Sequence, residues 1–530
     1  MEIVVYNPVF FSFNMSKVQI KFSNSLTPSD PDKQSVLIFG KRQYLENLQY
    51  DEISIKFGTK VSKEHYHCAL NQITSGILDS VPVYLKYVTL IKFNSKCSRY
   101  NTPTNCHQLT RLIKTHCTGQ DEYIVILCEY KDVFASACAV ARSYSLYCRK
   151  NSNASYTVTV EFIVVDQDDY TKHSFLSDAD LDCLKAAKNA IRTAARIIDT
   201  PCNEMHTDAF LEEITLIGNS LGIKPVIIRG EELKQKGFGG LYNVGKAAEH
   251  PPALAILSHT VKDAKETIAW VGKGIVFDTG GLFIKSRSSM PGMKRDCGGA
   301  AGILGAFYVA VKMGFKENLH AIFCLAENSV GPLAMRPDDI ITLYSGKTVE
   351  VNNTDAEGRL VLGDGVAYAK KDLGATTIVD MATLTGAQGV STGRYHAAII
   401  TNDEECELET VKAGKLSGDL VHAMPYAPEL HFVEFGSSFA DMKNSVSDSS
   451  CGAVSCAGLF IGSHIGFDYE GKWLHIDMAK TSYHGEKATG YGVALLNTLF
   501  GYASDNPMLL KLAAQFKSDG VAEKNSTSAP

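Results

Sequence analysis

The chain contains the stretch Asn353-Thr354-Asp355-Ala356-Glu357-Gly358-Arg359-Leu360, which comes soon after an apolar, strand-like run at 347–351. Asp355 and Glu357 lie two residues apart, so their side chains point the same way from an extended or turning backbone. Two carboxylates that converge on one point repel each other unless a cation lies between them. The stretch therefore predicts a metal site, and Arg359 indicates an anion bound beside it.

A second segment supplies further charged residues. It begins with Ala269-Trp270-Val271-Gly272, which we interpret as a short buried strand, and it continues through Lys273, Asp278, Lys285 and Asp296. Glycines lie near each acid, and a glycine lets the backbone approach a ligand closely. We expect the charged side chains of both segments to form one site.

The two segments together resemble the leucyl aminopeptidase family of two-metal exopeptidases. The likeness rests on Lys273-x4-Asp278-x6-Lys285, then Asp296, then the octapeptide 353–360, and it covers roughly residues 190 to 505. Within that family the chain is most similar to the branch of probable, or leucyl-like, aminopeptidases. That closer likeness rests on Ala440-Asp441-Met442-Lys443-Asn444-Ser445 and on the run Gly458 to Asp468.

The resemblance implies a role for each matched residue. One divalent metal would be held by Lys273, Asp278, Asp296 and Glu357, and the other by Asp278, Asp355 and Glu357. Lys285 and Arg359 would be the catalytic residues, with a bicarbonate held by Arg359 to accept a proton. Met293 would line the pocket for the substrate side chain, and the backbone of Thr383 and Leu384 would line the cleft. The family also implies short peptide substrates and a homo-hexamer.

The charges and ligand types of this residue set suit two divalent metal ions. Four carboxylates and two divalent cations balance in charge, which a buried site requires. Oxygen-rich ligands suit zinc, manganese or magnesium, and of these we expect zinc or manganese. Lys273 can donate a lone pair only when neutral, a form that a nearby dication favours. Two metals can bind one water and direct it at a carbonyl, while Lys285 stabilises the oxyanion.

Other interpretations of the same residues remain. An isolated Asp-x-Glu pair is usually a solvated turn, and paired glycines alone are usually turns. A catalytically silent scaffold with the same fold, or a two-metal phosphoesterase that uses carboxylates with lysine and arginine, would share much of this set. Because all the elements occur together and in order, we favour a metal-dependent aminopeptidase that releases single N-terminal residues.

Composition limits the class of protein. The 530 residues are 45% hydrophobic with a net charge of −6, so no general basic surface indicates nucleic acid as a partner. The 14 cysteines include no Cys-x-x-Cys pair, and Cys128, Cys138 and Cys324 lie in apolar runs, which favours reduced, buried thiols. No signal-peptide pattern and no membrane-spanning apolar run is evident, so we expect a cytoplasmic protein with no membrane partner.

The pattern of apolar runs predicts an α/β protein with two domains. An N-terminal α/β domain at 1–165 has strands at 123–128 and 158–165 and a helix at 133–147. A linker and connecting helix occupy 166–198, and a larger catalytic α/β domain at 199–516 has a mainly parallel central sheet. We expect its strands at 253–257, 268–271, 320–325 and 376–379, its helices at 298–313 and 357–371, and a disordered polar tail at 517–530.

Overall fold

The computed structural model describes residues 16–85, 87–150, 155–446, 448, 450 and 452–517. Of the expected polar tail at 517–530, only Lys517 falls within this range. The chain forms two compact units. The first comprises Met1–Arg192, Ala413–Gly418 and Asn506–Pro530, and the second comprises Thr193–Lys412 and Asp419–Asp505.

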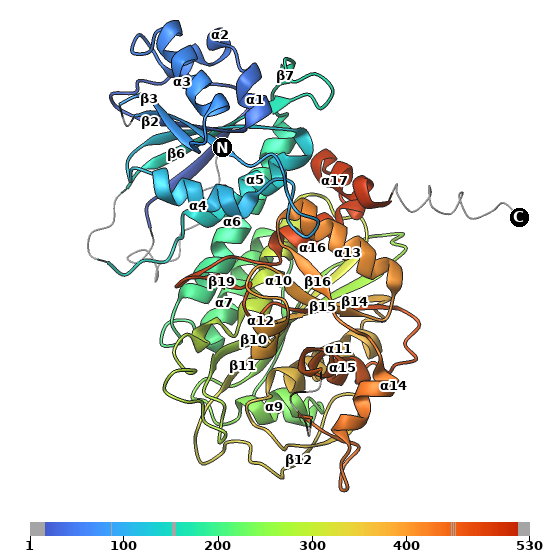
Figure 1. The fold of residues 1–530 in the computed structure, drawn as a ribbon. Coiled ribbons are helices and arrows are strands. Elements are labelled where there is room, and N and C mark those ends of the chain that lie inside the picture. Colours follow the sequence, from blue (N-terminus) through green and yellow to red (C-terminus); the bar gives the residue numbers. More distant parts are fainter. Residues whose placement is uncertain are drawn as a thin grey trace, which may run out of the picture. The chain divides into compact units, whose positions relative to one another are not determined.

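The first unit is built on a mainly parallel sheet with the strand order β1-β6-β5-β2-β4-β3, and β7 pairs with β6 (Figure 1). Only β3 and β7 run antiparallel to their neighbours. The expected strands correspond to β5 and β6, and the expected helix at 133–147 is α5, which begins at Tyr130 and ends at Ser143. The bounds of the strands are β1 Gln19–Ser23, β2 Ser35–Lys41, β3 Ser80–Tyr84, β4 Val88–Phe93, β5 Glu122–Cys128, β6 Thr157–Val165 and β7 His173–Ser174.

Helices pack on this sheet through apolar side chains. The core between the sheet and helices α1 and α3 includes Ile38, Tyr44, Ile73 and Val125, all fully buried. The helices of the first unit are α1 Arg42–Asn47, α2 Tyr50–Ile53, α3 Lys63–Ser75, α4 Cys106–His116, α5 Tyr130–Ser143 and α17 Pro507–Lys517, while α6 Asp178–Asp199 continues into the second unit.

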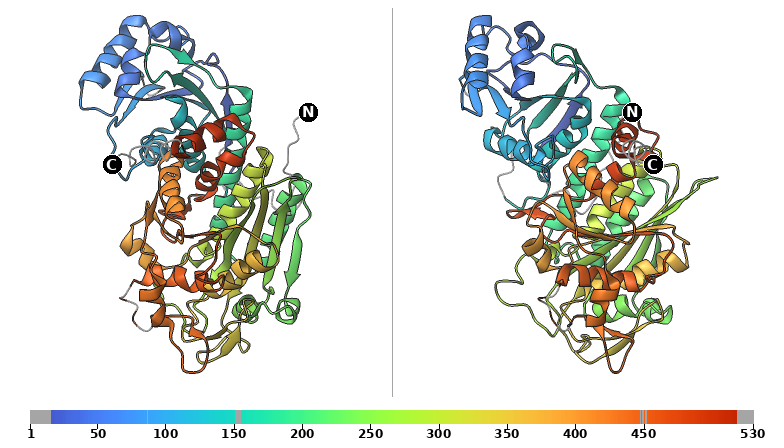
Figure 2. Two further views of the ribbon diagram at one scale, coloured as in Figure 1. Left: turned by 90° about the vertical axis from the view of Figure 1, so that its right-hand side faces the viewer. Right: turned by 45° about the vertical axis from the view of Figure 1, so that its right-hand side comes forward.

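The second unit is built on an eight-stranded sheet with the order β16-β15-β18-β14-β10-β11-β9-β8. Figure 2 shows the ribbon of this unit from two further directions. Its four central strands, β18, β14, β10 and β11, are parallel. The expected mainly parallel central sheet is therefore confirmed. The bounds are β8 Val226–Arg229, β9 Ala253–His259, β10 Thr267–Asp278, β11 Asn318–Asn328, β14 Thr377–Ala382, β15 Ala397–Thr401, β16 Val421–Ala423 and β18 Lys472–Asp477.

Helices cover both faces of this sheet, which explains why its central strands are continuous apolar runs. One face carries α7 Thr207–Ser220, α10 Gly298–Lys312 and α16 Val493–Leu499, and the other carries α9 Gly239–Gly245, α11 Gly358–Lys371 and α15 Ala453–Ser463. The other α-helices are α8 Glu231–Gln235, α12 Gly386–Ser391, α13 Glu404–Ser417 and α14 Pro428–His431. A small sheet contains β12 Ile340–Thr342, β13 Thr348–Glu350 and β17 Met442–Lys443, and a hairpin pairs β19 Tyr483–His484 with β20 Lys487–Ala488.

Strand β10 is much longer than the expected strand at 268–271, because it runs on to Asp278. Gly272 and Gly274 lie inside the strand, where they let helix α10 approach the sheet. A Cβ atom on Gly272 would lie 2.6 Å from the Cα atom of Ala300 on α10. The glycines thus serve close packing rather than a turn, and Lys273 lies inside the strand rather than after it.

Two further expectations concern the cysteines and the membrane. Cys128, Cys138 and Cys324 are buried free thiols. Across the described residues, every helix is too short or too polar to cross a membrane.

Candidate active site

The charged residues of the two sequence segments come together at the carboxyl ends of the central strands. Asp278 ends β10, and its register partner Asn328 ends the neighbouring parallel strand β11. Thr383 follows the end of β14. Asp355 lies in the turn before helix α11, and Glu357 is the N-cap of that helix. Strand ends and helix starts of an α/β sheet meet at this edge, where ligands commonly bind.

Two lysines divide the acids into pairs. Lys273 Nζ lies 2.8 Å from Asp296 Oδ2 and 2.8 Å from Glu357 Oε1. Lys285 Nζ lies 2.7 Å from Asp278 Oδ2 and also forms an ion pair with Asp355. Each ammonium group therefore holds two carboxylates together that would otherwise repel each other.

The acids are arranged closely enough to share a cation. Carboxylate oxygens of Asp278, Asp355 and Glu357 all lie within 4.8 Å of one another. Glu357 is almost fully buried, and no described residue makes a hydrogen bond to its oxygen Oε2. A buried anionic oxygen without a partner is costly, and a divalent metal with oxygen ligands would satisfy it. The residues present therefore fit a metal centre.

The charges of the site shift its pKa values in opposite directions. Burial would lower the pKa of Lys273, but the negative charges of Asp296, Glu357 and Asp278 outweigh burial and raise it. Burial, followed by the charge of Glu357, raises the pKa of Asp278 to about 6. Burial also raises the pKa of Asp296 well above its usual range. In Glu357 the effect of burial is overcome by Lys273 and Lys285, which lower its pKa.

Neutral groups orient the carboxylate of Asp278. Its Oδ1 accepts hydrogen bonds from the Asn328 side chain at 2.8 Å and from the Gly280 amide at 2.8 Å. The Asn328 amide nitrogen also donates to the carbonyl of Thr354 at 3.1 Å, so it links β11 to the octapeptide. Gly280 has φ +83°, a conformation that favours glycine. Asn328 was not predicted as a site residue, although its place at the end of an apolar run was a usable signal.

Arg359 lies on the first turn of α11 and is held from one side only. Its Nη1 donates to the carbonyl of Asn444 at 3.0 Å, and its buried Nε has no hydrogen-bond partner among the described residues. Burial lowers the pKa of Arg359 to about 10. Asn444 also donates through Nδ2 to the carbonyls of Asn353 and Ala356, at 2.6 and 3.2 Å, and so fastens the octapeptide. This role of Asn444 was not foreseen.

The three residues expected to contact substrate differ in their surroundings. Thr383 is buried, and its hydroxyl donates to Asp296 Oδ1 at 2.9 Å while its carbonyl accepts from Lys273 at 3.1 Å. Leu384 donates its amide to Asp477 at 3.1 Å. Met293 is partly exposed at the start of the 3-10 turn Met293–Arg295, which leads to Asp296.

Comparison with known proteins agrees with this geometry. The pattern of the cytosol aminopeptidase family, catalytic domain, matches residues 192–497, and that of the M17 aminopeptidase N-terminal domain 2 matches residues 34–153. The chain belongs to the cytosol aminopeptidase family. The chain is 56% identical over 500 residues to the probable aminopeptidase NPEPL1 of Homo sapiens. This match covers 93% of this chain and 95% of the relative.

A second relative is similar to this chain in sequence, and a solved structure with the same name is similar in fold. The aminopeptidase is 45% identical over 500 residues to leucine aminopeptidase 1 of Caenorhabditis elegans, covering 93% of this chain and 99% of that protein. A solved structure of the Caenorhabditis elegans leucine aminopeptidase superimposes with a TM-score of 0.87 and 44% identity, covering 93% of this chain and 100% of that chain. The expected family, branch and α/β fold are confirmed, and the chain is a metal-dependent aminopeptidase that hydrolyses peptide bonds.

Proposed function

We propose that this aminopeptidase removes single N-terminal residues from short peptides with two zinc or manganese ions bound among the clustered acids. Lys273, Asp278, Asp296 and Glu357 hold one ion, and Asp278, Asp355 and Glu357 hold the other. The observation that carries the proposal is the convergence of the Asp278, Asp355 and Glu357 carboxylates within 4.8 Å, with one Glu357 oxygen that has no hydrogen-bond partner among the described residues. Bound divalent ions supply Lewis acidity to the scissile carbonyl and a nucleophilic water.

Lys285 is the group that we propose to stabilise the oxyanion. Its ammonium is mostly buried, and although burial alone lowers the pKa, Asp278 and Glu357 outweigh burial and keep the group protonated. A charged donor held in place before the reaction stabilises developing negative charge more than a mobile one. The pairing of Lys285 with Asp278 and Asp355 supplies that placement.

Arg359 has a different role, because a guanidinium does not accept protons at neutral pH. We propose that Arg359 would hold a bicarbonate, a group that would supply the proton acceptor that the guanidinium cannot be. The buried Nε of Arg359, without a partner among the described residues, supports this proposal, since it leaves a donor directed at no protein acceptor. The bond to Asn444 fixes the opposite edge of the guanidinium.

The remaining proposals concern substrate, assembly and location. Met293, Thr383 and Leu384 would contact the peptide, with Met293 lining the side-chain pocket. Residues 199–516 would form the catalytic domain, after an N-terminal domain at 1–165 and a linker with its connecting helix at 166–198. We infer a homo-hexamer in the cytoplasm, in keeping with the family.

Two substitutions test the assigned roles. Glu357→Ala should abolish both metal loading and turnover, whereas Lys285→Ala should spare the metals but lower the rate. Metal content after dialysis and the hydrolysis of aminoacyl-anilides with added manganese or zinc measure the two effects separately. The exposed Glu405 and the surface Lys234 offer matched controls as Glu405→Ala and Lys234→Ala. Wild-type rates in both test variants would refute the assignments.

A further inference from the structure

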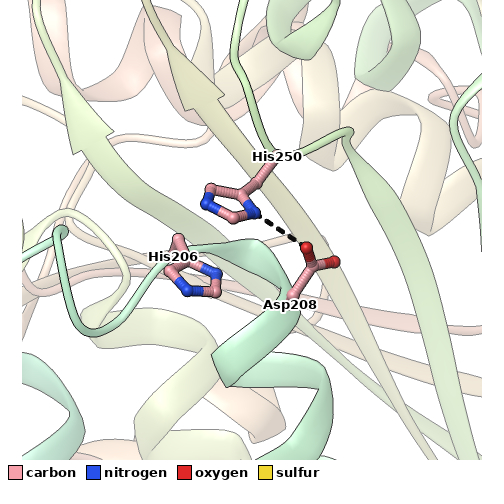
Figure 3. Close-up of side chains that lie close together, drawn as sticks. All are labelled: His206, Asp208 and His250. Carbon is pink, nitrogen blue, oxygen red and sulfur yellow. Dashed lines mark hydrogen bonds and ion pairs between the residues drawn. The ribbon is translucent and has the colours of Figure 1, made fainter.

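A second group of potential metal ligands lies away from the carboxylate cluster. Figure 3 shows His206, Asp208 and His250 facing one another, with donor atoms all within 4.8 Å. His206 is the N-cap of α7, Asp208 lies in the first turn of that helix, and His250 lies in the loop before β9. The His206 and His250 rings are stacked, with centroids 3.6 Å apart and planes 5° apart. His250 Nδ1 lies 2.8 Å from Asp208 Oδ2.

The two histidines open onto a cleft of about 730 Å³. Cys202, Glu249 and Glu327 also line this cleft, so further metal-binding side chains surround the pair. Phe277 and Glu327 line it from β10 and β11, whereas the next residues, Asp278 and Asn328, belong to the catalytic centre. Because successive residues of a strand point in opposite directions, the side chains of Phe277 and Glu327 point away from those of Asp278 and Asn328.

The charges within this group favour neutral imidazole. Asp208 also forms an ion pair with Arg229 on β8, so its negative charge is already shared. Two imidazole rings stacked at 3.6 Å cannot both be protonated without like-charge repulsion. Burial, followed by the proximity of His250, lowers the pKa of His206. The lowered pKa of His206 favours its neutral form, the form in which histidine binds metals.

We propose that His206, Asp208 and His250 bind a transition-metal ion of the zinc class, separate from the catalytic metals. Imidazole nitrogen with carboxylate oxygen suits zinc, whereas magnesium and manganese prefer oxygen alone. Zinc–nitrogen bonds of about 2.0–2.1 Å place two nitrogens of a tetrahedral site roughly 3.3 Å apart. Ligand atoms of His206, Asp208 and His250 all lie within 4.8 Å of one another, so the three side chains can reach one ion.

Binding requires the two rings to rotate out of their stack. The ring planes must tilt from parallel so that both lone pairs point at the ion, and the ion replaces the proton between His250 Nδ1 and Asp208. The His250 side chain is 33% exposed and the Asp208 side chain is 32% exposed, so both have room to move. His206 Nδ1 now accepts a bond of 3.3 Å from the Ala209 amide, a long bond that tilting gives up at small cost.

Two variants separate metal binding from a purely structural role. His250→Phe keeps an aromatic face against His206 but removes both nitrogens. His206→Asn keeps an acceptor for the first turn of α7, because asparagine is a good N-cap. His65→Phe, on helix α3 of the first unit, controls for loss of an exposed histidine.

The measurement is zinc bound per chain after equilibrium dialysis against free Zn²⁺, determined by elemental analysis. We expect the wild type and His65→Phe to bind one zinc more per chain than His250→Phe or His206→Asn. The same loss should appear in the Glu357→Ala background, where the catalytic metals are absent, so failure of this proposal is distinguishable from failure of the catalytic assignment. Equal zinc in the wild type and in both histidine variants, with matching circular dichroism, would overturn it.

Discussion

Thr383→Val is the most direct test of how the catalytic centre is held in place. The two side chains have nearly the same shape, so the change removes little more than the hydroxyl that donates to Asp296 Oδ1 at 2.9 Å. Thr383 is buried, and its carbonyl bond to Lys273 is unaffected because it belongs to the backbone. A hydrogen bond to a charged acceptor contributes about 1.5–3 kcal/mol. That energy corresponds to about 10–150-fold in metal affinity, which overlaps the range of about 10–100-fold found for groups that orient metal ligands.

The assay is a titration of the metal-depleted enzyme with manganese, with hydrolysis of an aminoacyl-anilide as the readout. Asp296 belongs to only one of the two proposed ligand sets, so we expect one binding step to weaken and the other to stay near wild type. Thr410→Val is the matched control, since Thr410 is also fully buried but donates its hydroxyl to the carbonyl of Cys406 within α13. An unchanged manganese titration for Thr383→Val would refute the role assigned to this hydrogen bond.

Three further predictions concern stability, each measured by denaturant unfolding. Gly272→Ala should destabilise the second unit by about 1–3 kcal/mol, because its new Cβ would lie 2.6 Å from Ala300 Cα. Gly386→Ala is the control, since a Cβ there would meet no atom of another segment within 4 Å. Equal stability of the two variants would contradict the packing argument. Lys56→Met should cost about 3–5 kcal/mol by leaving the fully buried Glu161 without its ion pair, and adding Glu161→Gln should recover part of it; no recovery would point to lost packing instead. Burial, then Lys347, lowers the pKa of His464 to about 3, below the value of about 6.5 in the unfolded chain. Between these two pKa values the unfolded state binds more protons, so the free energy of unfolding should fall as pH falls, by up to about 1.4 kcal/mol per pH unit. His464→Gln should flatten this dependence of stability on pH. Equal slopes for the variant and the wild type would exclude His464 as the cause.

Much of the fold could be predicted because the central strands are buried on both faces. The strands β9, β11 and β14 and the helices α10 and α11 stand out as apolar or periodic runs, and their expected positions agree with the structure to within a few residues. Strand β10 was predicted too short, although it continues through Gly272 and Gly274 to Asp278. Only the approach of α10 explains them, and a contact between distant segments is not visible in local sequence.

The site could be predicted only in part, for a related reason. The charged residues Lys273, Asp278, Asp355 and Glu357 are conspicuous because charges are rare beside buried strands. Asn444 escaped notice because an asparagine in a polar run has no distinctive pattern. Its importance comes from the octapeptide carbonyls it reaches across 88 and 91 positions of sequence. The His206 and His250 pair was missed likewise, because 44 residues separate two histidines that fold into one stack.

The positions of Phe277 and Glu327 have a consequence for communication between the two sites. Each is joined by one peptide bond to a residue of the proposed catalytic centre, Asp278 or Asn328. A ligand in the cleft that shifts the backbone at either residue therefore also shifts that neighbouring group. Binding free energies are reciprocal, so an occupant of the catalytic centre would alter affinity in the cleft by the same factor, and the direction of that factor would be measurable from either side.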